Sequence, residues 1–242
     1  MTIDFQPPPF IEKFQYKNCQ QVNDPVTRKR VYVTPDGESL PSVTTILSAT
    51  KDMTALNEWK KRVGEAKAAE ITKEAAGVGT AMHGNLERFI AGMQRQPGNN
   101  PVHVQAHQMA DVIISNGLSG VNEVWAMEQS LYFPGLYSGT TDLVGVYKDN
   151  PCVMDYKQTN KPKKEEWVED YKMQLVAYIL AHNEIYGTDI REGHVFMCSR
   201  AFEYQQFDLW PKDFNKYQDL WLNKVEEYYT TGLQGYKQLL TD

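Results

Sequence analysis

The spacing of apolar residues predicts helices along much of the first half of the chain. Between Thr54 and Val63 the apolar side chains recur at intervals of three or four, while lysines and an arginine occupy other faces. Gly77 and Gly79 are expected to separate two later helices, because glycine is a poor helix former. Further helices are predicted over 65–76, 80–90 and 101–116, and Ser42 can cap a short helix that runs to Leu47.

A period of two predicts strands in two regions. Val31 and Val33 alternate with other positions before the turn residues Pro35-Asp36-Gly37, which predicts a hairpin. After residue 117 the chain is rich in β-branched and aromatic residues, in three segments separated by Pro134-Gly135 and Lys148-Asp149-Asn150. We expect these three segments to form adjacent antiparallel strands.

The remaining pattern completes an α/β fold. A helix is predicted over 165–186, two short strands near 192–198 and 202–209, and a last helix from Pro211 to about Tyr229. This order of elements indicates a mixed sheet flanked by helices. We expect an extended arm over 1–25 and one domain over 26–242, which divides into a helical part (42–116) and a core (117–242).

Composition narrows the class of protein. With 242 residues, 41% of them hydrophobic, the chain can form one sizeable core. It has neither an apolar run long enough for a membrane span nor a recognisable secretory signal, and its three cysteines are far apart, so we expect a reducing, cytoplasmic location. The net charge of −6 argues against a protein that coats nucleic acid, but an enzyme can bind it through local basic patches.

Two acids and a lysine stand out in the strand region. Asp142 and Asp155 lie in neighbouring predicted strands, where acids are uncommon and costly to bury without a partner. Lys157 follows Asp155 by two residues, so both side chains emerge on one face. A divalent cation would explain the acids, and the three residues together suit phosphodiester hydrolysis. A structural salt bridge at a strand end explains them equally well.

Two residue pairs on helices add candidates. His83 and Glu87 are four apart and share a helix face, so His83 is a candidate metal ligand or a partly buried helix histidine. Gln174 and Tyr178 share a face in the same way, and they could contact a phosphate or a base, or form the edge of the core.

The order of these motifs resembles the RecB-like branch of the PD-(D/E)xK nuclease superfamily. Within that branch the chain is similar to the mitochondrial genome maintenance exonuclease type. The segments that carry the resemblance span roughly residues 30–200 and are LPSVTTIL, the helix of Trp59–Arg62, GTAMHGNLE, EQSLYFPGLYSGTTDLVG, VMDYKQT and QLVAYILA. Each is short, and their common order is what makes the pattern specific.

The resemblance implies a restriction-endonuclease-like fold and a role for each motif residue. Metal ligation is implied for His83, Asp142, Asp155 and the backbone carbonyl of Tyr156, and Lys157 is implied as the catalytic lysine. Gln174 and Tyr178 match the branch's substrate-contacting helix. Glu87 matches a family acid less closely, and Glu128 matches an acid that is not expected to be catalytic. Mg²⁺ is the implied cofactor, with Mn²⁺ as a substitute and no iron–sulfur cluster.

Three departures from the branch's pattern concern single positions. Thr141 precedes Asp142 where the superfamily's name has proline, and the second acid is Asp155 rather than glutamate. Gln158-Thr159 replaces the more usual threonine-led pair after the lysine. The last change could alter contacts of the strand, while the residues expected to carry the chemistry are kept.

Basic residues form three islands that could hold a nucleic acid. They are Arg28–Arg30, Lys60–Arg62, and Lys161 with Lys163-Lys164. Lys163 and Lys164 follow the strand of Lys157, and we expect them to bind substrate, whereas the other two islands could equally be solvated faces. Tyr132, Phe133 and Tyr137 surround the Pro134-Gly135 turn and could either stack bases or pack the hairpin tip.

The function expected from these residues is a Mg²⁺-dependent DNA exonuclease that acts on single strands or ends. A non-catalytic nucleic-acid-binding or scaffold domain with vestigial site residues is the alternative, and a metallohydrolase with a small substrate is a more remote one. DNA is the expected partner, and no membrane partner is expected. The compact chain would suit a phage or bacterial protein, which in the first case would act in the host cytoplasm.

Overall fold

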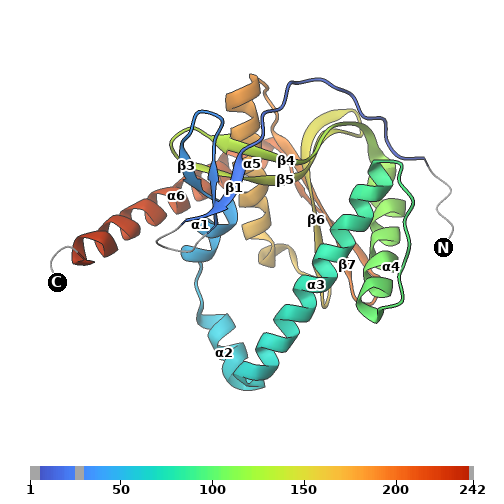
Figure 1. Ribbon diagram of the computed structural model, residues 1–242, viewed down its shortest axis with the longest axis horizontal. Coiled ribbons are helices and arrows are strands. Elements are labelled where there is room, and N and C mark those ends of the chain that lie inside the picture. Colours follow the sequence, from blue (N-terminus) through green and yellow to red (C-terminus); the bar gives the residue numbers. More distant parts are fainter. Residues whose placement is uncertain (1–5, 25–29, 240–242) are drawn as a thin grey trace.

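A five-stranded mixed sheet forms the centre of the molecule (Figure 1). The computed structural model describes residues 6–24 and 30–239, the last seven without their side chains. The sheet order is β4 (Val121–Phe133), β5 (Tyr137–Tyr147), β6 (Asn150–Thr159), β7 (Glu192–Ser199) and β8 (Tyr204–Leu209). Only β6 and β7 are parallel. The predicted meander and the mixed sheet are therefore confirmed.

Helices cover both faces of this sheet. One face packs against α5 (Glu169–Tyr186), with α1 (Val43–Ala49) and α6 (Pro211–Leu239) beside it. The other face packs against α3 (Glu65–Ile90) and α4 (Pro101–Asn116). Because β6 and β7 run parallel, the chain must cross over between them, and α5 makes that crossover. The helix α6 extends beyond its predicted end near Tyr229.

The expected break at Gly77 and Gly79 is wrong, because α3 is continuous through both residues. A methyl group at Gly79 would lie 3.6 Å from Cγ of Gln158, and one at Gly77 would lie 3.9 Å from Cγ1 of Val102. The glycines therefore face β6 and α4, where an added methyl group would make ordinary van der Waals contact. Tertiary packing on those elements outweighs the helix penalty of about 1 kcal/mol for each glycine.

A small antiparallel sheet stands beside the start of β5. It consists of β1 (Gln20–Asn23), β2 (Arg30–Val33) and β3 (Ser39–Pro41), so the predicted hairpin is confirmed. The strand β1 lies inside the segment that was expected to be an extended arm. Its strand structure depends on pairing with β2, which the local residue pattern does not reveal.

The preceding residues follow the outer edge of β4. The backbone N–H of Ile11 donates to the carbonyl of Val124 at 2.7 Å, and the N–H of Val124 donates to the carbonyl of Pro9 at 2.9 Å. These bonds cover part of an otherwise unpaired strand edge. Residues 9–11 are thus bound along the edge of β4, whereas residues 1–5 of the expected arm lie outside the described residues.

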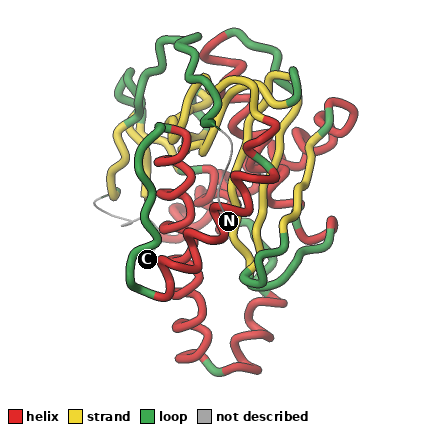
Figure 2. The backbone as a smooth tube through the Cα atoms, turned by 90° about the vertical axis from the view of Figure 1, so that its right-hand side faces the viewer, coloured by secondary structure: helices red, strands yellow, loops and turns green. Residues whose placement is uncertain are grey.

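The helix α2 (Thr54–Val63) buries none of its side chains. Figures 1 and 2 show α2 and the first turns of α3 projecting below the rest of the molecule. Two short 3₁₀ turns, η1 (Leu118–Gly120) and η2 (Glu165–Trp167), complete the described elements. Within residues 6–24 and 30–239, no helix combines the length and the apolar character that crossing a membrane requires.

Candidate active site

The site forms where β5 and β6 stop pairing. Their register ends at Leu143 and Met154, and beyond these residues β5 continues beside β4 while β6 continues beside β7. Asp142 and Asp155 are the first residues past the last pair. Because the two strands separate here, the two carboxylates and Lys157 line one cavity of about 300 Å³.

Asp142 is held by a backbone and a side-chain contact. Its Oδ2 accepts a hydrogen bond from the backbone N–H of Tyr156 at 2.7 Å, which spans the gap between the strands. Its Oδ1 lies 3.4 Å from Nδ1 of His83. Burial opposes the charge, but the attraction of His83 and the hydrogen bonds lower the pKa of Asp142 below its usual value. The carboxylate is therefore charged at neutral pH.

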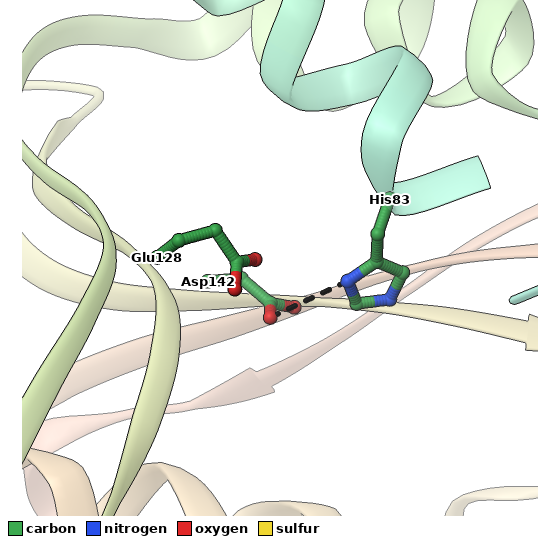
Figure 3. Close-up of side chains that lie close together, drawn as sticks. All are labelled: His83, Glu128 and Asp142. Carbon is green, nitrogen blue, oxygen red and sulfur yellow. Dashed lines mark ion pairs between the residues drawn. The ribbon is translucent and has the colours of Figure 1, made fainter. Parts of the chain in front are cut away.

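His83 reaches this gap from α3, which lies on the face of the sheet opposite to α5 (Figure 3). Its Nε2 lies 3.0 Å from the backbone carbonyl of Tyr156. A carbonyl only accepts, so Nε2 carries a proton and Nδ1 faces Asp142. Burial lowers the pKa of His83, but the neighbouring Asp142 carboxylate outweighs burial and raises it to about 9. The carbonyl of Tyr156, expected beside a metal, accepts this hydrogen bond; its role as a ligand stays a prediction.

Glu128 completes the cluster, although the sequence does not predict it to be a catalytic residue or a metal ligand. It lies in β4 with a φ of 49°, in the left-handed region that residues other than glycine rarely adopt. One ligand atom from each of His83, Glu128 and Asp142 lies within 4.8 Å of the other two (Figure 3). Partial withdrawal from water, followed by the charges of Asp142 and Glu87, raises the pKa of Glu128 to about 7.

A signal for Glu128 was available in the hairpin. The residues on either side of it pair with those on either side of Asp142, namely Met127 with Leu143 and Gln129 with Thr141. Glu128 and Asp142 therefore lie opposite each other, at equal distances from Gly135 in the turn. Counting outward from that turn would have placed the two acids on one face.

Asp155 and Lys157 form an ion pair on the face that carries α5. Oδ2 of Asp155 lies 2.5 Å from Nζ of Lys157, as the spacing of two predicts. Asp155 is only 3% exposed, and its burial raises its pKa despite the lysine. Burial opposes the charge of Lys157, but Asp155 and Asp142 raise its pKa above the usual value. The ring of Tyr171 lies 5.4 Å from Nζ of Lys157.

Gln174 and Tyr178 bring α5 to the same cavity. Both line it, and Nε2 of Gln174 donates to the Tyr178 hydroxyl at 3.4 Å. Gly139 on β5 makes room for this tyrosine, since a methyl group there would lie 3.0 Å from Cε1 of Tyr178. The two residues predicted to share a helix face are thus next to the acids, and their contact with substrate stays a prediction.

Four predicted residues do not line the cavity: Glu87, Tyr156, Lys163 and Lys164. The backbone of Lys163 instead exchanges two hydrogen bonds with the side chain of Gln205, of 2.7 and 2.8 Å. The ammonium of Lys164 lies 3.8 Å from Glu166, and both side chains are exposed. The residues that sequence reasoning did not expect in this cavity come mainly from the small sheet and α1, and they include Gln21, Arg30, Tyr32 and Thr44.

The aromatic residues at the β4–β5 turn pack inward. Tyr137 is 1% exposed and meets the ring of Trp221 edge to face, with 4.9 Å between the ring centres. Phe133 stacks on Tyr137 at 5.7 Å. Tyr132 is buried and donates to Asp36 at 3.3 Å. These contacts favour the packing role over base stacking. In the basic island Arg28–Arg30, Arg28 and Lys29 lie outside the described residues.

The chemistry of the donors fits a hard divalent cation. His83, Glu128 and Asp142 offer one nitrogen and two carboxylate oxygens at a short mutual distance. The buried Oδ2 of Asp155 is paired with Lys157, and burial still raises the pKa of this carboxyl group. An acid that is costly to bury in its charged form suits a place near bound positive charge. His83, Asp142 and one or both of Glu128 and Asp155 would therefore hold the cation.

Comparison with known proteins finds three similar proteins, and all three are named mitochondrial genome maintenance exonuclease 1. The chain is 29% identical over 202 residues to the protein of Mus musculus, 27% over 208 residues to that of Xenopus tropicalis and 26% over 201 residues to that of Homo sapiens. Each alignment covers 78% of this chain. No protein-family model matches the chain.

The chain spans 57–59% of the length of these relatives, so the alignments compare it with only part of each. The motifs predicted a similarity to the mitochondrial genome maintenance exonuclease type. This similarity is confirmed, at 26–29% identity over 78% of the chain. The comparisons thus relate the chain to proteins that are named as exonucleases.

Proposed function

We propose that this protein is a metal-dependent DNA exonuclease of the RecB-like PD-(D/E)xK type, which hydrolyses phosphodiester bonds at single strands or ends. The observation that carries the proposal is the convergence of Asp142, Asp155, Lys157 and His83 on one cavity at the point where β5 and β6 separate. The names of the related proteins supply the second support, since genome maintenance by an exonuclease implies DNA as the substrate.

The acids and the imidazole supply the ligands that Mg²⁺ or Mn²⁺ would need. A divalent cation bound there would polarise a phosphoryl oxygen of the substrate and make a nearby water more acidic. His83 is oriented for this task, because the Tyr156 carbonyl fixes its Nε2 and leaves Nδ1 toward Asp142. Asp142 is fixed in the same way by the N–H of Tyr156.

Lys157 is the residue that acts on the attacking side. Its raised pKa keeps it protonated at neutral pH, so it does not remove a proton from water. An ammonium at this place can instead hold the attacking water through its lone pairs, or stabilise the charge that develops on the phosphoryl group. Its ion pair with Asp155 fixes its position in the absence of substrate.

A cleavage assay tests this function. End-labelled single-stranded and double-stranded DNA, with and without a blocked 5′ end, would be incubated with the protein in Mg²⁺, Mn²⁺ or EDTA. We expect metal-dependent release of short products from single strands. The variants Lys157→Ala and Lys157→Met should abolish it while thermal unfolding remains cooperative, and Lys212→Ala, which changes an exposed residue of α6, should not.

The alternatives make different predictions in the same assay. Full activity in both Lys157 variants would overturn the assignment of the site. DNA binding without cleavage under every metal condition would favour the scaffold domain instead. Turnover of small phosphodiesters without cleavage of polymers would favour the small-substrate hydrolase.

A further inference from the structure

The catalytic cavity continues into a second one along α1. The second cavity, of about 260 Å³, shares Thr44, Lys157 and Gln174 with the first. It extends from them to Ser48, Lys51 and the start of α5. A third cavity, of about 400 Å³, shares Thr44 and Ser48 with the second. Shared lining residues place the three cavities side by side along α1, and neither Asp142 nor Asp155 lines the second or the third.

The lining of the second cavity along α1 contains two hydroxyl groups followed by a cation. Thr44, Ser48 and Lys51 are separated by four and three residues, so they follow one side of α1 and its end. Within α1, at 1.5 Å per residue, Thr44 and Ser48 are roughly 6 Å apart, and Lys51 lies two residues beyond the end of the helix. These three residues therefore extend the lining from the first cavity toward the start of α5.

Lys51 forms an exposed ion pair with Asp170, and a substrate phosphate could take the place of this carboxylate. Its Nζ lies 2.5 Å from Oδ2 of Asp170 at the start of α5, and the two side chains are 52% and 37% exposed. Exposed ion pairs contribute little free energy, because water competes for both charges. A phosphate that enters the second cavity would offer Lys51 a second anion and would compete directly with Asp170.

We propose that this second cavity is a phosphate subsite for the nucleotide next to the scissile bond, in which Lys51 exchanges the carboxylate of Asp170 for a backbone phosphate. The inference rests on the proposed function, since it takes a single nucleic-acid strand as the ligand. It assigns the role expected of Lys163 and Lys164 to a residue of another segment, because neither lysine lines these three cavities. Thr44 and Ser48, with their hydroxyl groups, line the same cavity.

Two substrates separate this subsite from the catalytic centre. A single-stranded oligothymidylate has a phosphate on each side of the scissile bond, whereas bis(4-nitrophenyl) phosphate has none. Lys51→Ala should lower kcat/KM for the oligonucleotide by about tenfold more than it lowers kcat/KM for bis(4-nitrophenyl) phosphate. This is the size of effect expected for one charged hydrogen bond. Lys51→Arg should restore most of the difference, and Lys212→Ala should leave both values unchanged.

Binding without turnover provides an independent measurement. The anisotropy of a fluorescent oligothymidylate would be followed in EDTA at several salt concentrations. Lys51→Ala should reduce the slope of log K against log salt by about 0.7, the value for one phosphate contact on a single strand. Asp170→Asn should act in the opposite direction and raise the affinity, because it removes the competing carboxylate.

The outcomes distinguish the subsite from the proposed function. An equal loss of turnover on both substrates, or an unchanged salt slope in Lys51→Ala, would overturn the subsite. Failure of the wild-type protein to cleave either substrate would refute the exonuclease while the salt slope still tests the subsite. A lower affinity in Asp170→Asn would show that Lys51 needs its carboxylate and would also overturn the exchange.

Discussion

The Asp142 carboxylate accepts a hydrogen bond from the backbone N–H of Tyr156, across the point where their strands stop pairing. The contact replaces a ladder hydrogen bond that the separation of β5 and β6 removes. Asp142 thus satisfies a buried backbone donor while its other oxygen faces His83. One side chain serves both the stability of the sheet and the arrangement of the site.

Two substitutions of Asp142 separate these roles. Asn in place of Asp keeps an oxygen that can accept from the N–H of Tyr156 but removes the charge. We expect Asp142→Asn to unfold within a few degrees of the wild type and to lose at least about a hundredfold in cleavage rate, or ~2.7 kcal/mol of transition-state stabilisation. Asp142→Ala should lose activity and also ~1–3 kcal/mol of stability, because a buried donor is left unpaired.

Calorimetry and the cleavage assay together check this pair. Equal stability of the Asn and Ala variants would show that the hydrogen bond from Tyr156 adds nothing to folding. Near wild-type turnover in the Asn variant would remove Asp142 from the proposed chemistry.

Glycine substitutions test why α3 continues where the sequence predicts a break. A methyl group at Gly77 would meet only Val102, at an ordinary contact distance of 3.9 Å. Gly77→Ala should therefore raise the free energy of unfolding by ~0.5–1 kcal/mol, the difference between alanine and glycine inside a helix. A decrease measured by urea unfolding would mean that the helix needs glycine at this place.

Gly145 is the matched opposite case. A methyl group there would lie 2.0 Å from the carbonyl oxygen of Glu123 on β4, which is a backbone atom. We expect Gly145→Ala to destabilise the protein by ~1–3 kcal/mol or more, because the two strands must move apart. The urea midpoints of the two variants should thus shift in opposite directions.

These residues also show what the sequence could predict. Strand periodicity placed Asp155 and Lys157 on one face correctly, since the rule depends only on local spacing. The continuation of α3 through Gly77 depends on packing against distant segments, and the strand β1 depends on pairing with β2. Local sequence patterns contain neither. The sequence pattern does not bring Glu128 to Asp142, because that proximity depends on the hairpin register and on a left-handed backbone conformation. The expectation for Lys163 and Lys164 rests on their position in the sequence. Neither lysine lines the two cavities, and their contact with substrate stays a prediction.

A buried histidine away from the site makes folding sensitive to pH. His182 on α5 is fully buried, lies 2.9 Å from the Tyr16 hydroxyl and lies 2.8 Å from the hydroxyl of Thr188. Burial lowers its pKa from 6.5 to about 4. The unfolded chain therefore binds one more proton than the folded protein between these values, and stability falls as the pH drops through this interval.

The contribution of His182 is measured against a variant that cannot titrate. At 1.36 kcal/mol for each pKa unit, His182 should reduce the free energy of unfolding by ~3 kcal/mol between pH 7 and pH 4. His182→Gln keeps hydrogen-bonding groups toward Tyr16 and Thr188, so its pH profile should be flatter by that amount. His103→Gln, an exposed control on α4, should follow the wild type. Parallel profiles for wild type and His182→Gln would contradict the prediction.

The geometry of Glu128 predicts which carboxylates hold the cation. Glu128 belongs to the close donor group with His83 and Asp142, whereas Glu87 lies one helical turn from His83 and does not line the cavity. Both changes to glutamine replace one carboxyl group near the site by an amide. If proximity to the donor atoms matters, Glu128→Gln should weaken Mn²⁺ binding by about tenfold, or ~1.4 kcal/mol, and Glu87→Gln by less than about twofold.

Titration of Mn²⁺ followed by electron paramagnetic resonance measures both variants alongside Asp155→Asn. A loss in Asp155→Asn alone would favour the donor set that the sequence motifs imply, in which Glu128 has no part. A loss in Glu128→Gln alone would favour the close group, with Asp155 reserved for positioning Lys157 through their ion pair. Losses in both would mean that the carboxylates of β4 and β6 bind the cation from opposite sides of Asp142. Equal effects of Glu128→Gln and Glu87→Gln on Mn²⁺ binding would mean that Glu128 acts only through its charge and is not a ligand.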